Sequence, residues 1–150
     1  MNHSPYPRFA LMILLSFVAM YILMFSMANV FANVYPSFNQ LYMAGLMTAP
    51  MVLFEIFLMG AMYQNKKLNL AIVAVALLAL IGFFFAIRYQ VGISDEEFLK
   101  SMIPHHAGAI LMCEKASIDD PDIKELCSGI LSGQQSEVDW MKAKLSELEK

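Results

Sequence analysis

Three long apolar stretches dominate the first 93 residues of the chain and are separated by short polar segments. They cover residues 9–32, 41–63 and 68–87, and Glu55 is their only charged residue. Because a helix rises ~1.5 Å per residue, about 20 residues cross a bilayer core of about 30 Å. The pattern therefore predicts three transmembrane helices. A cleavable signal peptide is less favoured for the first stretch, because its apolar region would be only roughly 7 to 15 residues long.

The remaining segment, residues 94–150, is polar and predicts two further helices. Ser94 and Glu97 form a capping box at the start of the first of these helices. That helix should run to about Ala116, with either a kink or a restart at Pro104.

The second of these helices begins at Asp120, an acidic N-cap that is followed by Pro121. Apolar residues then recur every three or four positions as far as Leu148, which is typical of an amphipathic helix. The short link before it predicts an antiparallel helical hairpin. The expected fold class is all-α, with a membrane domain over residues 1–93 and a helical-hairpin tail over residues 94–150.

Charge is divided unevenly between these two parts. Hydrophobic residues make up 59% of the chain and charged residues 15%, against about a quarter in a soluble domain, which disfavours a soluble protein. Residues 1–93 carry a net charge of +3 and residues 94–150 a net charge of −6. The acidic tail argues against nucleic-acid binding, which needs clustered Lys and Arg. Arg8, Lys66 and Lys67 fall on one side of the membrane domain, so the positive-inside rule places the tail outside the cytoplasm.

Several side chains of metal-binding type lie on the first tail helix. At ~100° per residue, one broad sector of that helix contains nitrogen and sulfur donors from Met102, His105, His106, Met112 and Cys113. Sulfur ligands select Cu(I) and imidazole suits copper or zinc, so the set indicates a soft metal ion. Plain helix packing remains an alternative at this point, because Met and Cys also serve as core hydrophobes.

The expected hairpin would bring residues of the two tail helices together. If it turns near Asp120, Cys113 faces Cys127 and His106 faces Gln134. Facing cysteines form either a disulfide or a pair of thiolate ligands, and the sequence leaves both open. The chain contains no HExxH or CxxC motif and no nucleophile–base set, so we expect no enzyme.

Glu55 is the one ionisable residue inside a predicted span. A charged side chain in hydrocarbon is costly, so we expect a proton or ion contact or an interhelical hydrogen bond there. Met43, Met47, Met51 and Met59 recur on the same span. We interpret them as helix packing rather than a metal path, because a spacing of four drifts ~40° per step around a helix.

Two motifs in the tail carry a resemblance to a known family. They read MIPHHAGAILM from Met102 to Met112 and QQSEVDWM from Gln134 to Met141. Both are similar to the pattern of the ferritin-like family catalogued as domain of unknown function 305, whose members include bacterial copper- and silver-binding proteins of the periplasm. The resemblance implies metal ligands and two side chains that orient the histidines. The implied ligands are Met102, His105, His106, Met112 and Met141, and the implied orienting partners are Gln134 and Glu137.

The resemblance also implies an architecture and a function. Family members often carry the motif twice in a four-helix domain, so this tail would be half of a ferritin-like bundle that a homodimer completes. The expected location is a bacterial inner membrane, with the tail extracytoplasmic. The expected function is membrane-anchored binding of Cu(I) or Ag(I) for metal homeostasis or resistance. The alternatives are a structural or dimerisation module and a component of a metal transport pathway.

Overall fold

The structure is a computed structural model that describes residues 4–150, and every regular element in that range is a helix. The elements are α1 (Tyr6–Leu23), η1 (Met24–Met27), η2 (Phe31–Asn33), α2 (Phe38–Leu58), α3 (Lys66–Arg88), α4 (Asp95–Lys115) and α5 (Pro121–Leu148). The expected all-α fold class is confirmed. The chain forms two compact units. One contains residues up to Leu23 together with Asn39–Val91, and the other contains Met24–Phe38 together with Gly92–Lys150.

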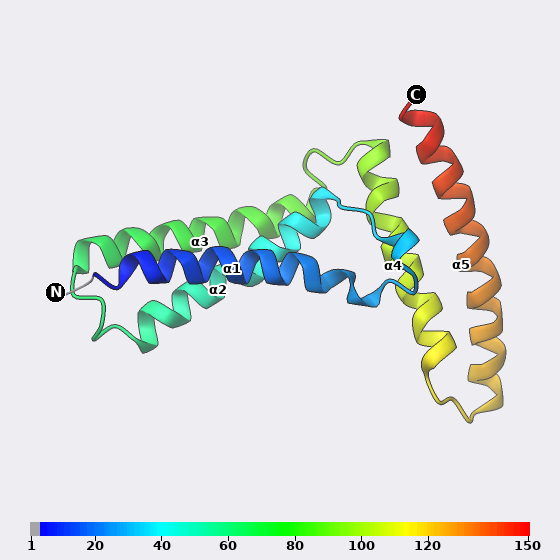
Figure 1. Cartoon of the computed structure of the whole chain (residues 1–150), viewed down its shortest axis with the longest axis horizontal. Helices are drawn as coiled ribbons and strands as arrows, with labels where there is room; N and C mark the ends of the chain where they lie inside the picture. Colours follow the sequence, from blue (N-terminus) through cyan, green and yellow to red (C-terminus); the bar gives the residue numbers. More distant parts are fainter. Residues whose placement is uncertain (1–3) are drawn as a thin grey trace. The chain divides into compact units, whose positions relative to one another are not determined.

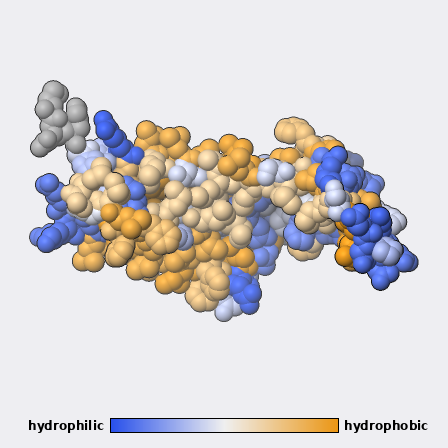
Figure 2. Space-filling model, turned by 90° about the horizontal axis from the view of Figure 1, so that it is seen from below, coloured by the Kyte–Doolittle hydropathy of each residue, from blue (hydrophilic) through white to orange (hydrophobic). Residues whose placement is uncertain are grey.

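The first unit consists of α1, α2 and α3, which lie alongside one another (Figure 1). Tyr6–Met27, Phe38–Leu58 and Lys66–Arg88 are long and apolar enough to cross a membrane, as the sequence predicts. Many of their apolar side chains point outward; Phe57, for example, is 85% exposed. Figure 2 shows the resulting surface, which is mostly hydrophobic along this unit. A soluble protein seldom exposes so large an apolar patch, whereas lipid covers it without cost.

A small buried core joins the three helices of this membrane unit. It is formed by Phe9, Val52, Ile56, Tyr63 and Ala76. Its aromatic members come from the start of α1 and from the turn that follows α2, so they hold together one end of the unit.

Two span boundaries differ from the sequence prediction. The first apolar run predicts a span to residue 32, but α1 ends at Leu23 and η1 continues only to Met27. The second predicts a span to residue 63, but α2 ends at Leu58 and turns follow. Apolar side chains that pack on protein and those that face lipid look the same in sequence, so hydropathy overextends both spans.

The second unit is built on α4 and α5, which pack against each other (Figure 1). Their shared core is formed by Leu99, Ile103, Ile110, Val138, Met141 and Leu145. The apolar positions that recur along both helices therefore meet on the faces that they present to each other.

Helix caps define where α4 and α5 begin. Ser94 Oγ accepts a hydrogen bond from the backbone N–H of Glu97, and Asp120 Oδ1 accepts from the backbone N–H groups of the first turn of α5. Both N-caps agree with the sequence prediction. α4 continues through Pro104 without a restart.

Residues 24–38 belong to this second unit and not to the membrane unit. η1 and η2 lie against α4. Tyr35 packs on the shared core, and the carboxylate of Glu97 accepts a 2.8 Å hydrogen bond from the backbone N–H of Phe38. This division differs from the single boundary at residue 94 that the sequence predicts. The carboxylate of Glu97 also differs from the capping box that the sequence predicts, because it accepts from the backbone N–H of Phe38 and not from that of Ser94.

Candidate metal centre

His106 is a buried histidine on the face of α4 that packs against α5. It is 9% exposed, whereas the neighbouring His105 is exposed to solvent. Successive helical residues are rotated by about 100°, so the two rings leave the helix in different directions. Their centroids are 5.9 Å apart and their planes are inclined at 65°. The two imidazoles that the sequence predicts as ligands therefore have different surroundings.

Both ring nitrogens of His106 contact oxygen atoms. Nδ1 lies 3.0 Å from the backbone carbonyl oxygen of Met102, and Nε2 lies 2.8 Å from Oε2 of Glu137 on α5. A carbonyl oxygen only accepts, so Nδ1 carries the proton that it donates. Nε2 then either donates a second proton to the Glu137 carboxylate or, in the neutral ring, accepts from the protonated carboxyl group.

The contact at Nδ1 is the arrangement by which proteins commonly hold a metal-binding imidazole. Donation from Nδ1 to a backbone carbonyl fixes the tautomer that leaves Nε2 for a metal ion. The carbonyl of Met102 therefore orients His106, a role that the family resemblance assigns to Gln134 and Glu137. Glu137 instead contacts the nitrogen that a metal ion would take, and its side chain is 58% exposed. Gln134 is half-buried one turn earlier on α5.

The three candidate methionines also differ in their surroundings. Met102 is half-buried at the edge of the α4–α5 core, and Met112 is 55% exposed. Met141 is only 6% exposed and is a member of that core. Met102 and Met112 are therefore available as thioether donors, whereas the geometry gives Met141 a packing role.

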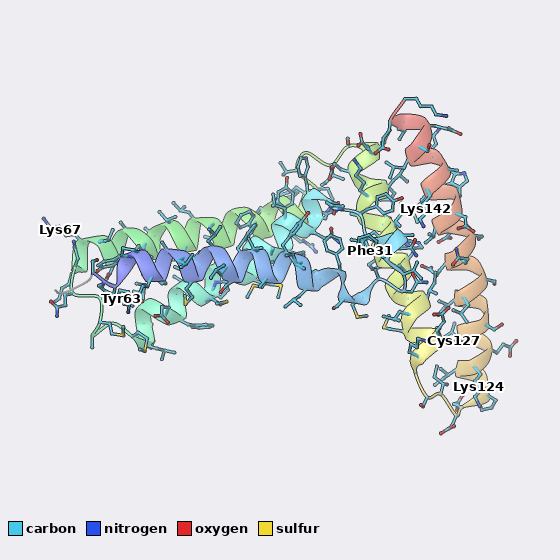
Figure 3. All side chains as sticks on the ribbon, viewed as in Figure 1. Phe31, Tyr63, Lys67, Lys124, Cys127 and Lys142 are labelled. Carbon is cyan, nitrogen blue, oxygen red and sulfur yellow. A yellow bond between two sulfur atoms is a disulfide. The ribbon has the colours of Figure 1, made fainter. Side chains whose placement is uncertain are left out.

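Cys113 and Cys127 form a disulfide between α4 and α5, with their Cα atoms 5.3 Å apart. Figure 3 places Cys127 on α5 near the link between the two helices. The cysteines face each other as the sequence predicts, and the disulfide is the alternative that is formed. The assignment of Cys113 as a metal ligand is corrected for this state, because a sulfur bonded to another sulfur is not a thiolate.

One copy of the chain does not assemble a complete ligand set of the usual residue types. Within residues 4–150, no three His, Cys, Asp or Glu side chains come together in a way that could hold a metal ion. The available donors are spread around one side of α4. They are Nε2 of His106, the ring of His105 and the thioethers of Met102 and Met112.

Glu55 lies in the membrane unit, near the end of α2. Its Oε1 accepts a 2.8 Å hydrogen bond from the hydroxyl of Tyr63, which is 4% exposed. Burial, followed by the hydrogen bond to Glu55 and its charge, raises the pKa of Tyr63 to about 12, so the hydroxyl remains a donor at neutral pH. Tyr63 lies in the turn after α2, so this contact is not the bond between two spans that the sequence suggests.

Comparison with known proteins identifies the family of the tail. The family model described as "Domain of unknown function (DUF305)" matches residues 87–145. An uncharacterized protein of Acanthamoeba polyphaga mimivirus is 34% identical over 150 residues, which cover 98% of this chain and 95% of that protein. The chain belongs to the DUF305 family. No solved structure matches it. The DUF305 match contains both histidines, the disulfide and Glu137, and the viral relative also aligns along the membrane unit.

Proposed function

We propose that this DUF305 protein is a membrane-anchored binder of soft metal ions, Cu(I) first and Ag(I) second, that serves metal homeostasis or resistance without catalytic turnover. The supporting observation is the contact between Nδ1 of His106 and the carbonyl of Met102, which leaves Nε2 as the metal-binding nitrogen. Met102 lies one turn before His106 on the same side of α4, and its side chain adds a thioether, a ligand that selects Cu(I).

The donor set fits a soft ion better than a hard one. His106 would bind through Nε2, with His105, Met102 and Met112 as further donors, and none of these groups is an oxygen ligand of the kind that Ca²⁺ or Mg²⁺ requires. The ion would take the place of the contact between Nε2 and Glu137. Protons compete with a metal ion for an imidazole nitrogen, so affinity should fall as the solution is acidified.

A second copy would supply the ligands that one copy lacks. In this proposal two α4–α5 hairpins complete a ferritin-like four-helix bundle. Apolar side chains on the outer side of α5 support this assembly: Trp140 is 64% exposed and Leu126 is 61% exposed. The tail would be extracytoplasmic on a bacterial inner membrane, and the disulfide supports that side because disulfides persist in oxidising compartments.

Metal titration of the full chain in detergent tests the proposal. Cu(I) affinity is measured by competition with a chromogenic chelator, and metal content is measured by mass spectrometry. His106→Ala should weaken binding by about tenfold or more, equivalent to at least 1.4 kcal/mol. His105→Ala should have a smaller effect, because that ring is not held in place. The double variant should lose most of the bound metal.

Two methionine substitutions provide a matched control. Leu conserves the volume of Met, so Met102→Leu and Met141→Leu should both keep the fold. Only Met102→Leu should weaken Cu(I) binding, because Met141 is a core residue. Full stoichiometry and affinity in the double-alanine variant would refute the metal site.

The competing candidate is a structural module, and the contact between His106 and Glu137 favours it because this contact joins α4 to α5. In that case His106→Ala and Glu137→Gln should destabilise the helix pair to a similar extent, and the wild-type chain should bind no Cu(I) at micromolar concentration. The two candidates therefore predict opposite results in the same titration.

A further inference from the structure

A second polar site lies in the membrane unit. A cavity of about 300 Å³ is lined by Arg8 and Met12 of α1, Glu55 of α2, and Met62 and Tyr63 of the following turn. The start of α1, the end of α2 and the start of α3 lie at the same end of the unit, and Figure 3 shows Tyr63 and Lys67 at that end. The cavity is therefore at the level where a membrane-spanning unit meets the lipid headgroups.

Two groups of opposite charge, Arg8 and Glu55, line this cavity. Within residues 4–150, no salt bridge joins Arg8 to Glu55, and neither takes part in another ion pair. One oxygen of Glu55 accepts from the hydroxyl of Tyr63, and the other has no hydrogen bond in the described chain. An unpaired charge near hydrocarbon is costly, so a ligand with both signs of charge would stabilise the site.

We propose that this cavity binds the headgroup of a zwitterionic phospholipid that carries a primary ammonium. The phosphate would bind the Arg8 guanidinium, which is suited to bidentate phosphate contacts, and the ammonium would donate to the free oxygen of Glu55. Met12, Met62 and Phe9 form the apolar part of the wall and would contact the glycerol and the first acyl carbons. A lone cation accounts for Glu55 but is repelled by Arg8, whereas this headgroup satisfies both.

Native mass spectrometry of the full chain in detergent tests the proposal. The protein is offered an equimolar mixture of phosphatidylethanolamine, phosphatidylcholine and phosphatidylglycerol with identical acyl chains. We expect one bound phosphatidylethanolamine with a preference of about tenfold over the other two, because only this lipid has both a phosphate and ammonium N–H donors without net charge. Equal retention of the three lipids would overturn the site.

Three variants separate the two halves of the headgroup. Glu55→Gln keeps an acceptor for Tyr63 and should abolish the preference for phosphatidylethanolamine over phosphatidylcholine. Arg8→Gln should weaken retention of both lipids, because both contain the phosphate. Arg88→Gln removes a cation from the far end of α3 and should change neither. An unchanged preference in the Glu55→Gln variant would contradict the proposal.

Two measurements on the wild-type protein keep the test independent of folding defects in a variant. Stepwise N-methylation of phosphatidylethanolamine should lower retention step by step, since each methyl group removes a donor. Soluble phosphoethanolamine at millimolar concentration should not displace the lipid, because it lacks the apolar contacts. Displacement by this compound would identify a free aminophosphate as the ligand and overturn the lipid assignment.

Discussion

Removal of the disulfide between Cys113 and Cys127 should destabilise the packing of α4 against α5. The variant without the disulfide should bind Cu(I) with the same affinity as the oxidised wild-type protein. Cys113 and Cys127 are 14 residues apart. Closing a loop of about 15 residues stabilises a fold by about 3 kcal/mol in the chain-entropy model. The fully buried Ile103 and Val138 belong to the core and not to this loop, so the helix pair should still form without the bond.

Hydrogen exchange of the full chain in detergent measures this loss directly. Because 1.4 kcal/mol corresponds to a factor of ten, about 3 kcal/mol predicts that amides of α4 and α5 exchange about two orders of magnitude faster in the double variant Cys113→Ser, Cys127→Ser. Amides of α1, α2 and α3 are the internal control and should keep their rates. Reduction of the wild-type protein should reproduce the effect, and the same reductant should not alter the double variant.

Two results would refute this reasoning about the cysteines. Exchange in α4 and α5 that changes by less than about threefold would show that the bond contributes little beyond what the core already supplies. A loss of Cu(I) affinity in the double-serine variant, relative to the oxidised wild type, would show that the sulfurs take part in metal binding after all.

The remaining predictions concern packing and charge. Val138→Ala should cost about 2 kcal/mol and accelerate exchange in α4 and α5, because Val138 is 0% exposed and the smaller residue leaves a cavity. Gly45→Ala should lower the thermal stability of the membrane unit, because the added Cβ would lie 2.4 Å from the ring of Phe83 on α3. Gly108→Ala should instead raise the stability of α4 by up to about 1 kcal/mol, because alanine has the higher helix propensity and its Cβ would have no contact closer than 3.6 Å. Lys100 donates a hydrogen bond to Glu96 on the same helix, and this bond raises the pKa of Lys100 above its usual value. The stabilisation is therefore complete below the ordinary lysine pKa and is lost as the pH rises through the raised pKa. Urea unfolding followed through Trp140 fluorescence should therefore show a loss of tail stability only above pH 10.5, and this loss should be absent from a Lys100→Gln variant.

Local signals were sufficient to predict the ends and the pairing face of the tail helices. Ser94 and Asp120 are caps whose hydrogen bonds reach only two or three residues along the chain, so sequence is enough to recognise them. Helical periodicity and a short link were enough to place Cys113 opposite Cys127, as the disulfide confirms.

Contacts between distant segments could not be predicted in the same way. Residues 24–38 are mostly apolar or aromatic, a pattern that fits the end of a span as well as a segment packed on α4. The contact between His106 and Glu137 joins residues on two helices. Helix spacing alone places Gln134 opposite His106, and only the family resemblance adds Glu137 as a partner of the histidines. Gln134 and Glu137 lie about one helical turn apart on α5, and the length of the link does not determine the register of α5 against α4 to within one turn.

The sequence also could not show which of the three motif methionines are accessible to a metal ion. Met102, Met112 and Met141 all belong to the family motifs, yet they range from half-buried to exposed to fully packed. A thioether serves equally well as a hydrophobe and as a ligand. Only packing distinguishes the two uses, and it removes Met141 from the set of accessible donors.

The contact between His106 and Glu137 contributes little to the stability of the fold. A buried hydrogen bond to a charged group stabilises a fold by about 1.5–3 kcal/mol, but Glu137 is 58% exposed, and solvent screening reduces such a pair to about 0–1 kcal/mol. An apolar side chain at this position would pack against α5 without any desolvation cost, so stability alone does not explain an imidazole there. A contact this weak is also no obstacle to a metal ion that binds Nε2. The Met102 carbonyl holds the ring from the other side, so His106 keeps its orientation whether Nε2 contacts Glu137 or an ion.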